Sequence, residues 1–190
     1  MIRSRPWLIL LLVTAIVLLS VDILAISPYA KKGHGKFGIK GGMIGRADFE
    51  TDNEVLLTTI GATFGLFADF PVSQKMYSGF SFDFHNIILQ NVKDFMFDIA
   101  WVNKYVIPME RWNVDVKPAV AVGLGILPDL EFVKDTRHLT VKVWVELHFK
   151  QPRQRSWLFE LGGFYTPEGG RKGVDVKIGP AIMLRAGYVF

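Results

Sequence analysis

The last seventeen residues of the chain, 174–190, alternate between apolar side chains and side chains that are mostly small or charged. The apolar set is Val174, Val176, Ile178, Pro180, Ile182, Leu184, Ala186, Tyr188 and Phe190. The residues between them include Asp175, Lys177 and Arg185. Because successive side chains of a strand point to opposite faces, this pattern predicts one long β-strand with one apolar and one polar face.

The same alternation recurs along most of the chain and predicts an all-β fold. We expect eight strands, near Lys36–Ile44, Val55–Phe70, Lys75–Leu89, Val92–Tyr105, Arg111–Ile126, Leu139–Lys150, Ser156–Tyr165 and Val174–Phe190. Half of the residues are hydrophobic, yet no stretch after the N-terminal segment has the roughly 20 apolar residues that a membrane-spanning helix needs. The pattern therefore favours an eight-stranded antiparallel up-and-down barrel that crosses a membrane with strands.

The N-terminal segment has the pattern of an export signal. Arg3 and Arg5 precede an apolar core that runs from Trp7 to Val21. Cleavage is expected after Ala25 or Ala30, and an uncleaved anchor helix is the alternative. We therefore divide the chain into a signal peptide with a short N-terminal segment, 1–30, and a barrel, 31–190. The chain has no cysteine, which excludes disulfides, thiol nucleophiles and cysteine metal sites.

The links between the strands differ in length. Pro71–Gln74 and Gln151–Arg155 are short, whereas Gly45–Glu54, Leu127–His138 and Thr166–Gly173 are longer and polar. Outer-membrane barrels have short periplasmic turns and longer external loops, so the short links are expected on the periplasmic side. Gln90-Asn91, a very short external link, and Val106–Glu110, a longer internal one, depart from this rule.

The side-chain volumes on the two faces indicate which face is inside. An eight-stranded barrel has an interior just wide enough for side chains to fill it or for one small ligand. The polar face is rich in Gly, Ala, Ser and Thr, whereas the bulky Phe, Trp, Leu, Ile and Val lie on the other face, with Phe67 as an exception. The apolar face is therefore expected to contact lipid. A soluble, lipocalin-like carrier with the faces reversed is the alternative.

Outward aromatic residues of a membrane barrel should lie at the level of the membrane interface. On the expected strand map, seven aromatic residues fall near the periplasmic rim: Phe70, Tyr105, Trp112, Phe149, Trp157, Tyr188 and Phe190. Aromatic richness alone would scatter them along the strands. Their common level supports the lipid-facing interpretation.

The N-terminal segment, the alternating strands, the short turns and the ending Leu184-Arg-Ala-Gly-Tyr-Val-Phe190 resemble the small, porin-like outer-membrane β-barrel proteins of Gram-negative-type bacteria. The resemblance implies a location in the bacterial outer membrane and two partners, namely outer-membrane lipid and the barrel-assembly machinery, with Tyr188 and Phe190 as the C-terminal signal. It implies a monomer with no cofactor. The positive charges are scattered along the chain and give no support for nucleic-acid binding. The loop Leu127–His138 is the candidate contact for a partner at the cell surface.

The polar face places many ionisable side chains in the expected lumen. This lumen network comprises Asp83, His85, Asp94, Asp98, Asp115, Lys117, Lys142, Glu146, His148, Glu160, Asp175, Lys177 and Arg185, and the same face also carries Lys40 and Lys150. Acids and bases nearly balance, and unpaired charges in a narrow lumen are costly, so a packed network of ion pairs is expected. The predicted role is structural or surface interaction, such as envelope integrity, adhesion or resistance. A narrow passive channel for ions or small solutes is the alternative.

One lumen contact can be placed from the sequence. If Gln90-Asn91 is a two-residue turn, Asp83 lies opposite Asp98, and two like charges at that distance need a bridging cation or a shared proton. Lys117 on the adjacent strand is the predicted bridge.

A lipid-modifying enzyme is the third alternative for function. A lipid A deacylase needs a serine activated by a histidine. Ser81 and His85 lie roughly 13 Å apart on one strand face and point away from lipid. No catalytic, cofactor-binding or metal-binding residue is therefore assigned.

Overall fold

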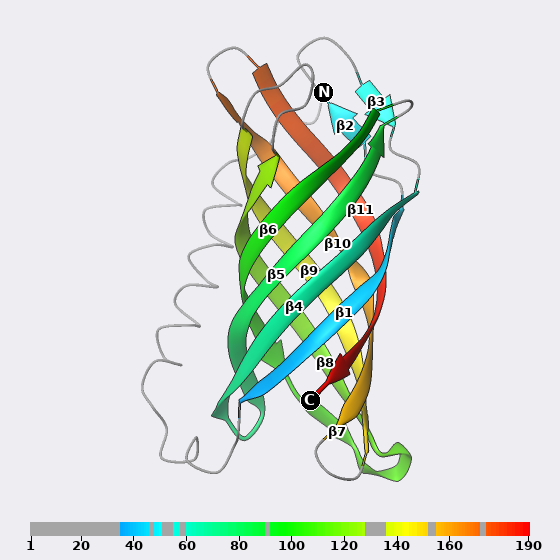
Figure 1. Cartoon of the computed structure of the whole chain (residues 1–190). Coiled ribbons are helices and arrows are strands. Elements are labelled where there is room, and N and C mark those ends of the chain that lie inside the picture. Colours follow the sequence, from blue (N-terminus) through cyan, green and yellow to red (C-terminus); the bar gives the residue numbers. More distant parts are fainter. Residues whose placement is uncertain are drawn as a thin grey trace.

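Eight long antiparallel strands form a closed barrel (Figure 1). The computed structural model describes residues 35–45, 48–50, 55–57, 60–89, 92–127, 136–151, 155–171 and 174–190. The barrel strands are β1 (Lys36–Gly45), β4 (Ile60–Ser73), β5 (Met76–Leu89), β6 (Val92–Tyr105), β8 (Val114–Leu127), β9 (Thr136–Lys150), β10 (Ser156–Arg171) and β11 (Val174–Val189). Each pairs with the next, and β1 pairs with β11 from Gly38↔Val189 to Gly45↔Ile182, which closes the barrel. The predicted fold class is confirmed.

Three short strands and one helical turn complete the described structure. They are β2 (Asp48–Glu50), β3 (Val55–Leu57), β7 (Ile107–Met109) and the 3₁₀ helix η2 (Glu110–Trp112). Among the described residues, no helix has the length and apolar character to cross a membrane. The expected export signal in 1–30 lies outside the described residues.

The predicted strand Val55–Phe70 is wrong at its start, because residues 55–57 belong to a different strand from β4. Its first three residues form β3, which pairs with β2 inside the predicted loop Gly45–Glu54. β2 in turn pairs with β11 through Lys177↔Glu50 and Ile178↔Phe49. This small hairpin therefore extends the sheet beside β11 at the end of the barrel opposite the C-terminus (Figure 1).

The predicted strand Arg111–Ile126 begins too early. Residues 110–112 form η2, and Asn113 follows in the left-handed conformation with φ 53°, which ends the turn before β8 begins at Val114. The predicted link Val106–Glu110 contains β7, which continues the pairing of β6 onto β8. Trp112 therefore lies in a turn at the rim and not on a barrel strand.

The predicted long loop Thr166–Gly173 is also wrong, since β10 continues to Arg171 and pairs with β11 as far as Val174. The register shifts between Phe164 and Thr166 and again between Thr166 and Gly169. These irregularities break the two-residue alternation on which the strand prediction depended.

Two further boundaries differ from the predictions. β9 begins at Thr136, so the loop before it is shorter than Leu127–His138. β4 extends to Ser73, which leaves only the turn Gln74-Lys75 before β5.

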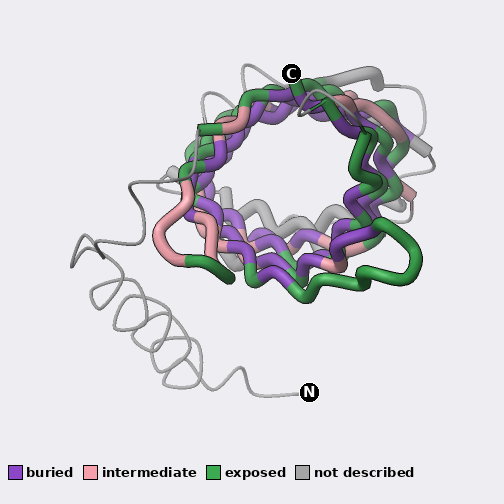
Figure 2. Tube along the Cα trace, turned by 90° about the horizontal axis from the view of Figure 1, so that it is seen from below, coloured by how far each residue is buried: buried purple, intermediate pink, exposed green. Residues whose placement is uncertain are grey.

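The barrel has its apolar side chains outside and its charged side chains inside. Figure 2 looks along the barrel and shows buried and exposed residues alternating around the wall. The exposed large hydrophobic residues come from every long strand and include Phe37, Phe64, Phe82, Ile99, Leu124, Val143, Leu161 and Leu184. Monomeric soluble proteins rarely expose contiguous apolar patches larger than a few hundred Å². This distribution confirms the predicted assignment of the two faces and opposes the lipocalin-like alternative.

The predicted outward aromatic residues gather at the end of the barrel that carries the C-terminus. Phe70, Tyr105, Trp112, Phe149, Trp157 and Phe190 are exposed and Tyr188 is partly exposed. Register pairs join several of them, because Trp157 lies opposite both Phe149 and Tyr188. The rings of Trp157 and Tyr188 pack edge to face at 5.0 Å. The aromatic residues therefore form a belt near this rim.

Candidate functional site: the polar lumen

The strands direct most of the predicted polar set into the barrel, where side chains fill the space. Nine of its members have at most 2% of their surface exposed: Asp83, His85, Asp98, Lys117, Lys142, Glu146, His148, Glu160 and Arg185. Asp115 is 7% exposed. Asp94, Asp175 and Lys177 lie on β6 and β11, but their side chains are outside the described residues. Lys150, expected inside, is exposed at the rim, where its ammonium lies 2.7 Å from the Asp115 carboxylate.

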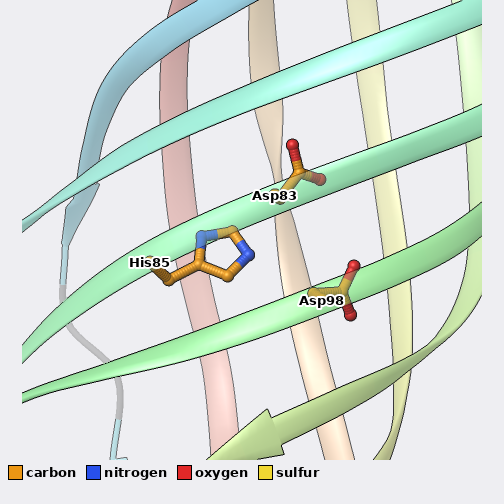
Figure 3. A group of neighbouring side chains, drawn as sticks. All are labelled: Asp83, His85 and Asp98. Atoms are coloured by element: carbon orange, nitrogen blue, oxygen red, sulfur yellow. The ribbon is translucent and has the colours of Figure 1, made fainter.

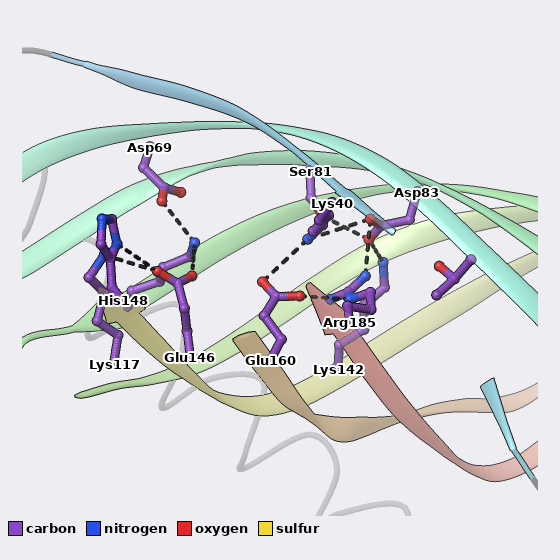
Figure 4. A network of polar contacts seen from close by, with 12 residues as sticks. Lys40, Asp69, Ser81, Asp83, Lys117, Lys142, Glu146, His148, Glu160 and Arg185 are labelled. Carbon is purple, nitrogen blue, oxygen red and sulfur yellow. Dashed lines mark hydrogen bonds and ion pairs between the residues drawn. The ribbon is translucent and has the colours of Figure 1, made fainter. Parts of the chain in front are cut away.

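One group of charges, the Asp83 cluster, consists of Lys40, Asp83, Asp98, Lys142, Glu160 and Arg185. Figure 4 labels all of them except Asp98, which Figure 3 shows beside Asp83. Asp83 accepts contacts from three cations: Lys142 at 2.5 Å, Arg185 at 3.1 Å and Lys40 at 3.5 Å. The cluster contains three acids and three bases, so its formal charges cancel. Such compensation is what allows charges to remain in an interior that excludes water.

The predicted opposition of Asp83 and Asp98 is confirmed, because the two residues are register partners on β5 and β6. The predicted bridge is wrong. Lys142 on β9 contacts both carboxylates, whereas Lys117 contacts Glu146 at 2.9 Å. Lys142 reaches this position because its strand is separated from β6 only by β8, and a lysine stem is long enough to extend across the lumen.

Glu160 and Arg185 extend the Asp83 cluster toward the strand pair β10–β11. Arg185 Nε lies 2.6 Å from Glu160 Oε2 while its Nη1 donates to Asp83, so one guanidinium joins two carboxylates. The planar fork of arginine suits this double contact. The Arg185 guanidinium and the Lys40 ammonium also lie 5.8 Å and 5.5 Å from the ring centre of Trp144, which is 2% exposed.

A second group, the Glu146 cluster, consists of Asp69, Lys104, Lys117, Glu146 and His148, of which Figure 4 labels all but Lys104. It lies closer to the aromatic belt than the Asp83 cluster does, because on β9 Glu146 is nearer than Lys142 to Phe149. Glu146 lies 2.6 Å from the Lys104 ammonium and 2.9 Å from the Lys117 ammonium. Lys104 also contacts Asp69 at 2.8 Å. With His148 neutral, the two acids and two lysines of this cluster have formal charges that cancel.

The predicted lumen network does not include Lys104, which is central to the Glu146 cluster. Asp98, which it does include, lies on the same strand. The two-residue alternation continues from Asp98 through Ala100 and Val102 to Lys104, and all four are buried. The alternation in the sequence is therefore a signal that points to Lys104.

Apolar side chains fill the space around the charges. Phe67, Leu158 and Val189 form one buried contact group, and Trp144 packs with Ala100, Val102, Ala119 and Ala121. Glycines make room for the larger groups. A Cβ on Gly65 would overlap the carboxylate of Asp83, and one on Gly38 would overlap the ring of Phe67. The small residues of the inner face therefore lie where space is short.

The lumen holds one set of potential metal ligands among the described residues: Asp83, His85 and Asp98, whose ligand atoms all lie within 4.8 Å of one another (Figure 3). The His85 Nδ1 contacts Thr63 Oγ1 at 3.0 Å, and its ring stacks on Phe164. The Lys142 ammonium already contacts both carboxylates. A divalent cation would have to displace this tethered cation, so the arrangement fits an internal ion pair better than a metal centre.

The rim side of the lumen also contains a serine–histidine–glutamate chain that the sequence did not reveal. His148 Nε2 contacts Ser156 Oγ, and His148 Nδ1 lies 3.1 Å from Glu146 Oε1. A carboxylate can only accept, so the Glu146 contact needs the imidazole proton on Nδ1 and leaves Nε2 as the acceptor that faces the serine hydroxyl. The Lys117 ammonium also lies at this Nδ1 and contacts Glu146 itself. Ser156, His148 and Glu146 are all buried inside the barrel, away from the outer face that a lipid substrate would approach.

The other serine and histidine considered for catalysis do not contact each other. Ser81 Oγ donates to Asp83 Oδ2 at 3.2 Å, whereas His85 contacts Thr63. Both side chains are buried inside the barrel and away from its outer face.

The fold matches solved outer-membrane barrels. The crystal structure of Neisserial surface protein A (NspA) aligns with a TM-score of 0.53 and 11% identity, covering 82% of this chain and 98% of that one. The crystal structure of a major outer membrane protein from Thermus thermophilus aligns with a TM-score of 0.51 and 11% identity, covering 83% and 99%. No protein-family model matches the sequence, and no curated protein matches it significantly. The expected resemblance to small outer-membrane barrels is confirmed at the level of the fold.

Proposed function

We propose that the chain is an integral outer-membrane barrel with a structural or surface-interaction role, and that its lumen does not conduct. The observation that carries this proposal is the burial of the lumen charges: Asp83, Asp98 and Lys142 are each 0% exposed. The side chains that line a water-filled pore would be in contact with water. A lumen in which the charges contact one another leaves no continuous path for a hydrated ion.

The outer surface supports the membrane placement. Apolar side chains are exposed on every long strand, and an aromatic belt lies at one end. In barrels of this class such a surface faces lipid, with aromatic residues at the interfaces. The Neisserial structure with the same fold is that of a surface protein. These features favour a bacterial outer-membrane location, with the rim that carries the C-terminus on the periplasmic side.

Conductance after reconstitution is the decisive test of the closed lumen. The chain would be refolded in detergent, checked for a mobility difference between boiled and unboiled gel samples, and inserted into planar bilayers. We expect a folded, detergent-stable barrel that produces no current steps above the lipid baseline.

A matched variant shows that the assay can detect an open lumen. Trp144→Ala combined with Phe67→Ala removes two large buried side chains and leaves every lumen charge in place. We expect this variant to conduct if it retains the gel shift. Steady conductance by the unaltered chain, with ion selectivity changed by Asp98→Asn, would instead establish the passive-channel alternative.

A further inference from the structure

The hairpin between β6 and β8 differs from the others at the C-terminal rim. β4 and β5 are joined by the short turn Gln74-Lys75, whereas β6 continues through Val106 into β7 and η2 before β8 begins. β7 stays paired with β8 through Ile107↔Val116 and Met109↔Val114. This hairpin lies at the lower rim in Figure 1.

The hairpin carries exposed apolar side chains that continue the outer face of β6. Tyr105, Ile107 and Met109 alternate along it and are 44%, 46% and 42% exposed. Trp112 in η2 follows and is 69% exposed, the largest fraction among the exposed large hydrophobic residues that the structure describes. We call Ile107, Met109 and Trp112 the apolar foot.

Basic side chains lie at the same rim. Lys75, Arg111, Lys150 and Arg155 are exposed, in three different links or strand ends, and Glu110 is an exposed acid among them. Tryptophan is enriched at the level of lipid headgroups, and basic residues near a membrane surface attract anionic lipids. Arg111 and Trp112 are neighbours in η2, so an apolar and a cationic group are presented together.

We propose that the apolar foot and these basic residues bind anionic phospholipid headgroups in the leaflet at this rim. The proposal rests on the proposed function, since it requires a barrel that spans the membrane. Lipid is the occupant because the surface is continuous: the foot follows Tyr105 on the lipid-facing side and lies at the end of the aromatic belt. The positive charges beside it give the preference for anionic headgroups.

The absence of cysteine allows the foot to be probed by a single label. Met109→Cys would carry an environment-sensitive NBD fluorophore, and the chain would be refolded into vesicles of phosphatidylcholine with phosphatidylglycerol. Leu161→Cys, on an outward position that is 61% exposed, reports the lipid-facing belt. Gln74→Cys, on the exposed polar turn at the same rim, reports water. We expect the Met109 label to resemble the Leu161 label in its blue-shifted emission.

Spin-labelled lipids then test the headgroup. We expect spin-labelled phosphatidylglycerol to quench the Met109 label at least about twofold more than spin-labelled phosphatidylcholine, because the rim charges concentrate anionic lipid. Arg111→Gln with Arg155→Gln, or high salt, should remove most of this preference. Glu110→Gln removes a negative charge from the same turn. It should therefore preserve or increase the preference for phosphatidylglycerol.

The outcomes distinguish failure of lipid binding by the apolar foot from failure of the membrane placement of the barrel. If the Met109 label behaves like the Gln74 label while the Leu161 label remains in lipid, the foot does not bind lipid but the membrane barrel stands. If the Leu161 label is also in water, the membrane placement itself fails. If the Met109 label is shielded yet insensitive to any lipid quencher, protein covers it and the proposal is overturned. Equal quenching by both headgroups overturns the preference for anionic lipid.

Discussion

The Asp83 cluster and the Glu146 cluster both keep charges inside the barrel, but they connect different parts of the wall. The Asp83 cluster draws on β1, β5, β6, β9, β10 and β11, so it extends across the seam where the first and last barrel strands meet. The Glu146 cluster draws on β4, β6, β8 and β9 and does not include the seam. Because only the Asp83 cluster joins β1 to β11 across the seam, closure of the barrel should depend more on this cluster than on the Glu146 cluster.

The two central acids also differ in the number of cations that they contact. Asp83 contacts Lys142, Lys40 and Arg185, each of which also contacts a second acid of the cluster. Glu146 contacts the ammonium groups of two lysines, of which Lys104 also contacts Asp69. We therefore expect substitutions in the two clusters to differ in magnitude.

The largest loss is expected from Asp83→Asn. The substitution preserves shape but leaves three buried cations facing two acids, and breaking a buried ion pair from one side costs about 3–5 kcal/mol. The free energy of unfolding in detergent micelles, followed by urea titration and the gel shift, measures this loss. Adding Lys142→Met restores equal numbers of acids and bases and should recover part of the stability. A loss below about 1 kcal/mol for Asp83→Asn would contradict the central role of this residue.

A smaller loss is expected from Glu146→Gln. Glu146 contacts two lysines, whereas Asp83 contacts three cations, so the cost should resemble that of removing hydrogen bonds to charged groups, about 1.5–3 kcal/mol. The same urea titration compares the two substitutions directly. If Glu146→Gln were the more damaging of the two, the seam-spanning cluster would not be the principal one.

The sequence predicted the wall of the barrel better than its contents. Strand alternation located the long strands, and the two-residue link after Leu89 was enough to place Asp83 opposite Asp98. It could not identify Lys142 as the bridge. Register relates only neighbouring strands, whereas a lysine stem extends across the lumen to groups on strands that are not its neighbours.

The errors in strand length have a related cause. A strand is recognisable in the sequence only where side chains alternate without interruption. β10 contains register shifts near Thr166, and the helical turn η2 precedes β8. Between Gly45 and Ile60, the short pair β2–β3 has strands of only three residues each, too short for alternation to be recognised. These local irregularities depend on how strands pair in three dimensions. They therefore could not be predicted from the alternation of side chains in the sequence.

Gly65→Ala tests how tightly the Asp83 cluster is packed. The new methyl group would overlap Asp83 Oδ1 and lie 3.1 Å from Lys40 Cε, so the carboxylate must move away from its partners. Overpacking of this kind costs about 1–3 kcal/mol of unfolding free energy. Gly45→Ala is the matched control, because a Cβ there meets nothing within 4 Å, and its effect should stay within about 0.5 kcal/mol. Equal effects of the two substitutions would mean that the lumen has room to adjust.

The smallest effect is expected from Asp115→Asn, which makes the same chemical change as Asp83→Asn in a different environment. Asp115 contacts Lys150 at 2.7 Å, but the lysine side chain is 46% exposed and water can replace the lost partner. Because one partner is in contact with water, we expect a contribution near that of a surface pair, about 0–1 kcal/mol, and screening by salt. Unfolding titrations of both variants at low and high salt would therefore separate the two environments. A salt-independent loss from Asp115→Asn as large as that from Asp83→Asn would show that the buried network continues to the rim, and that the aromatic belt does not mark its end.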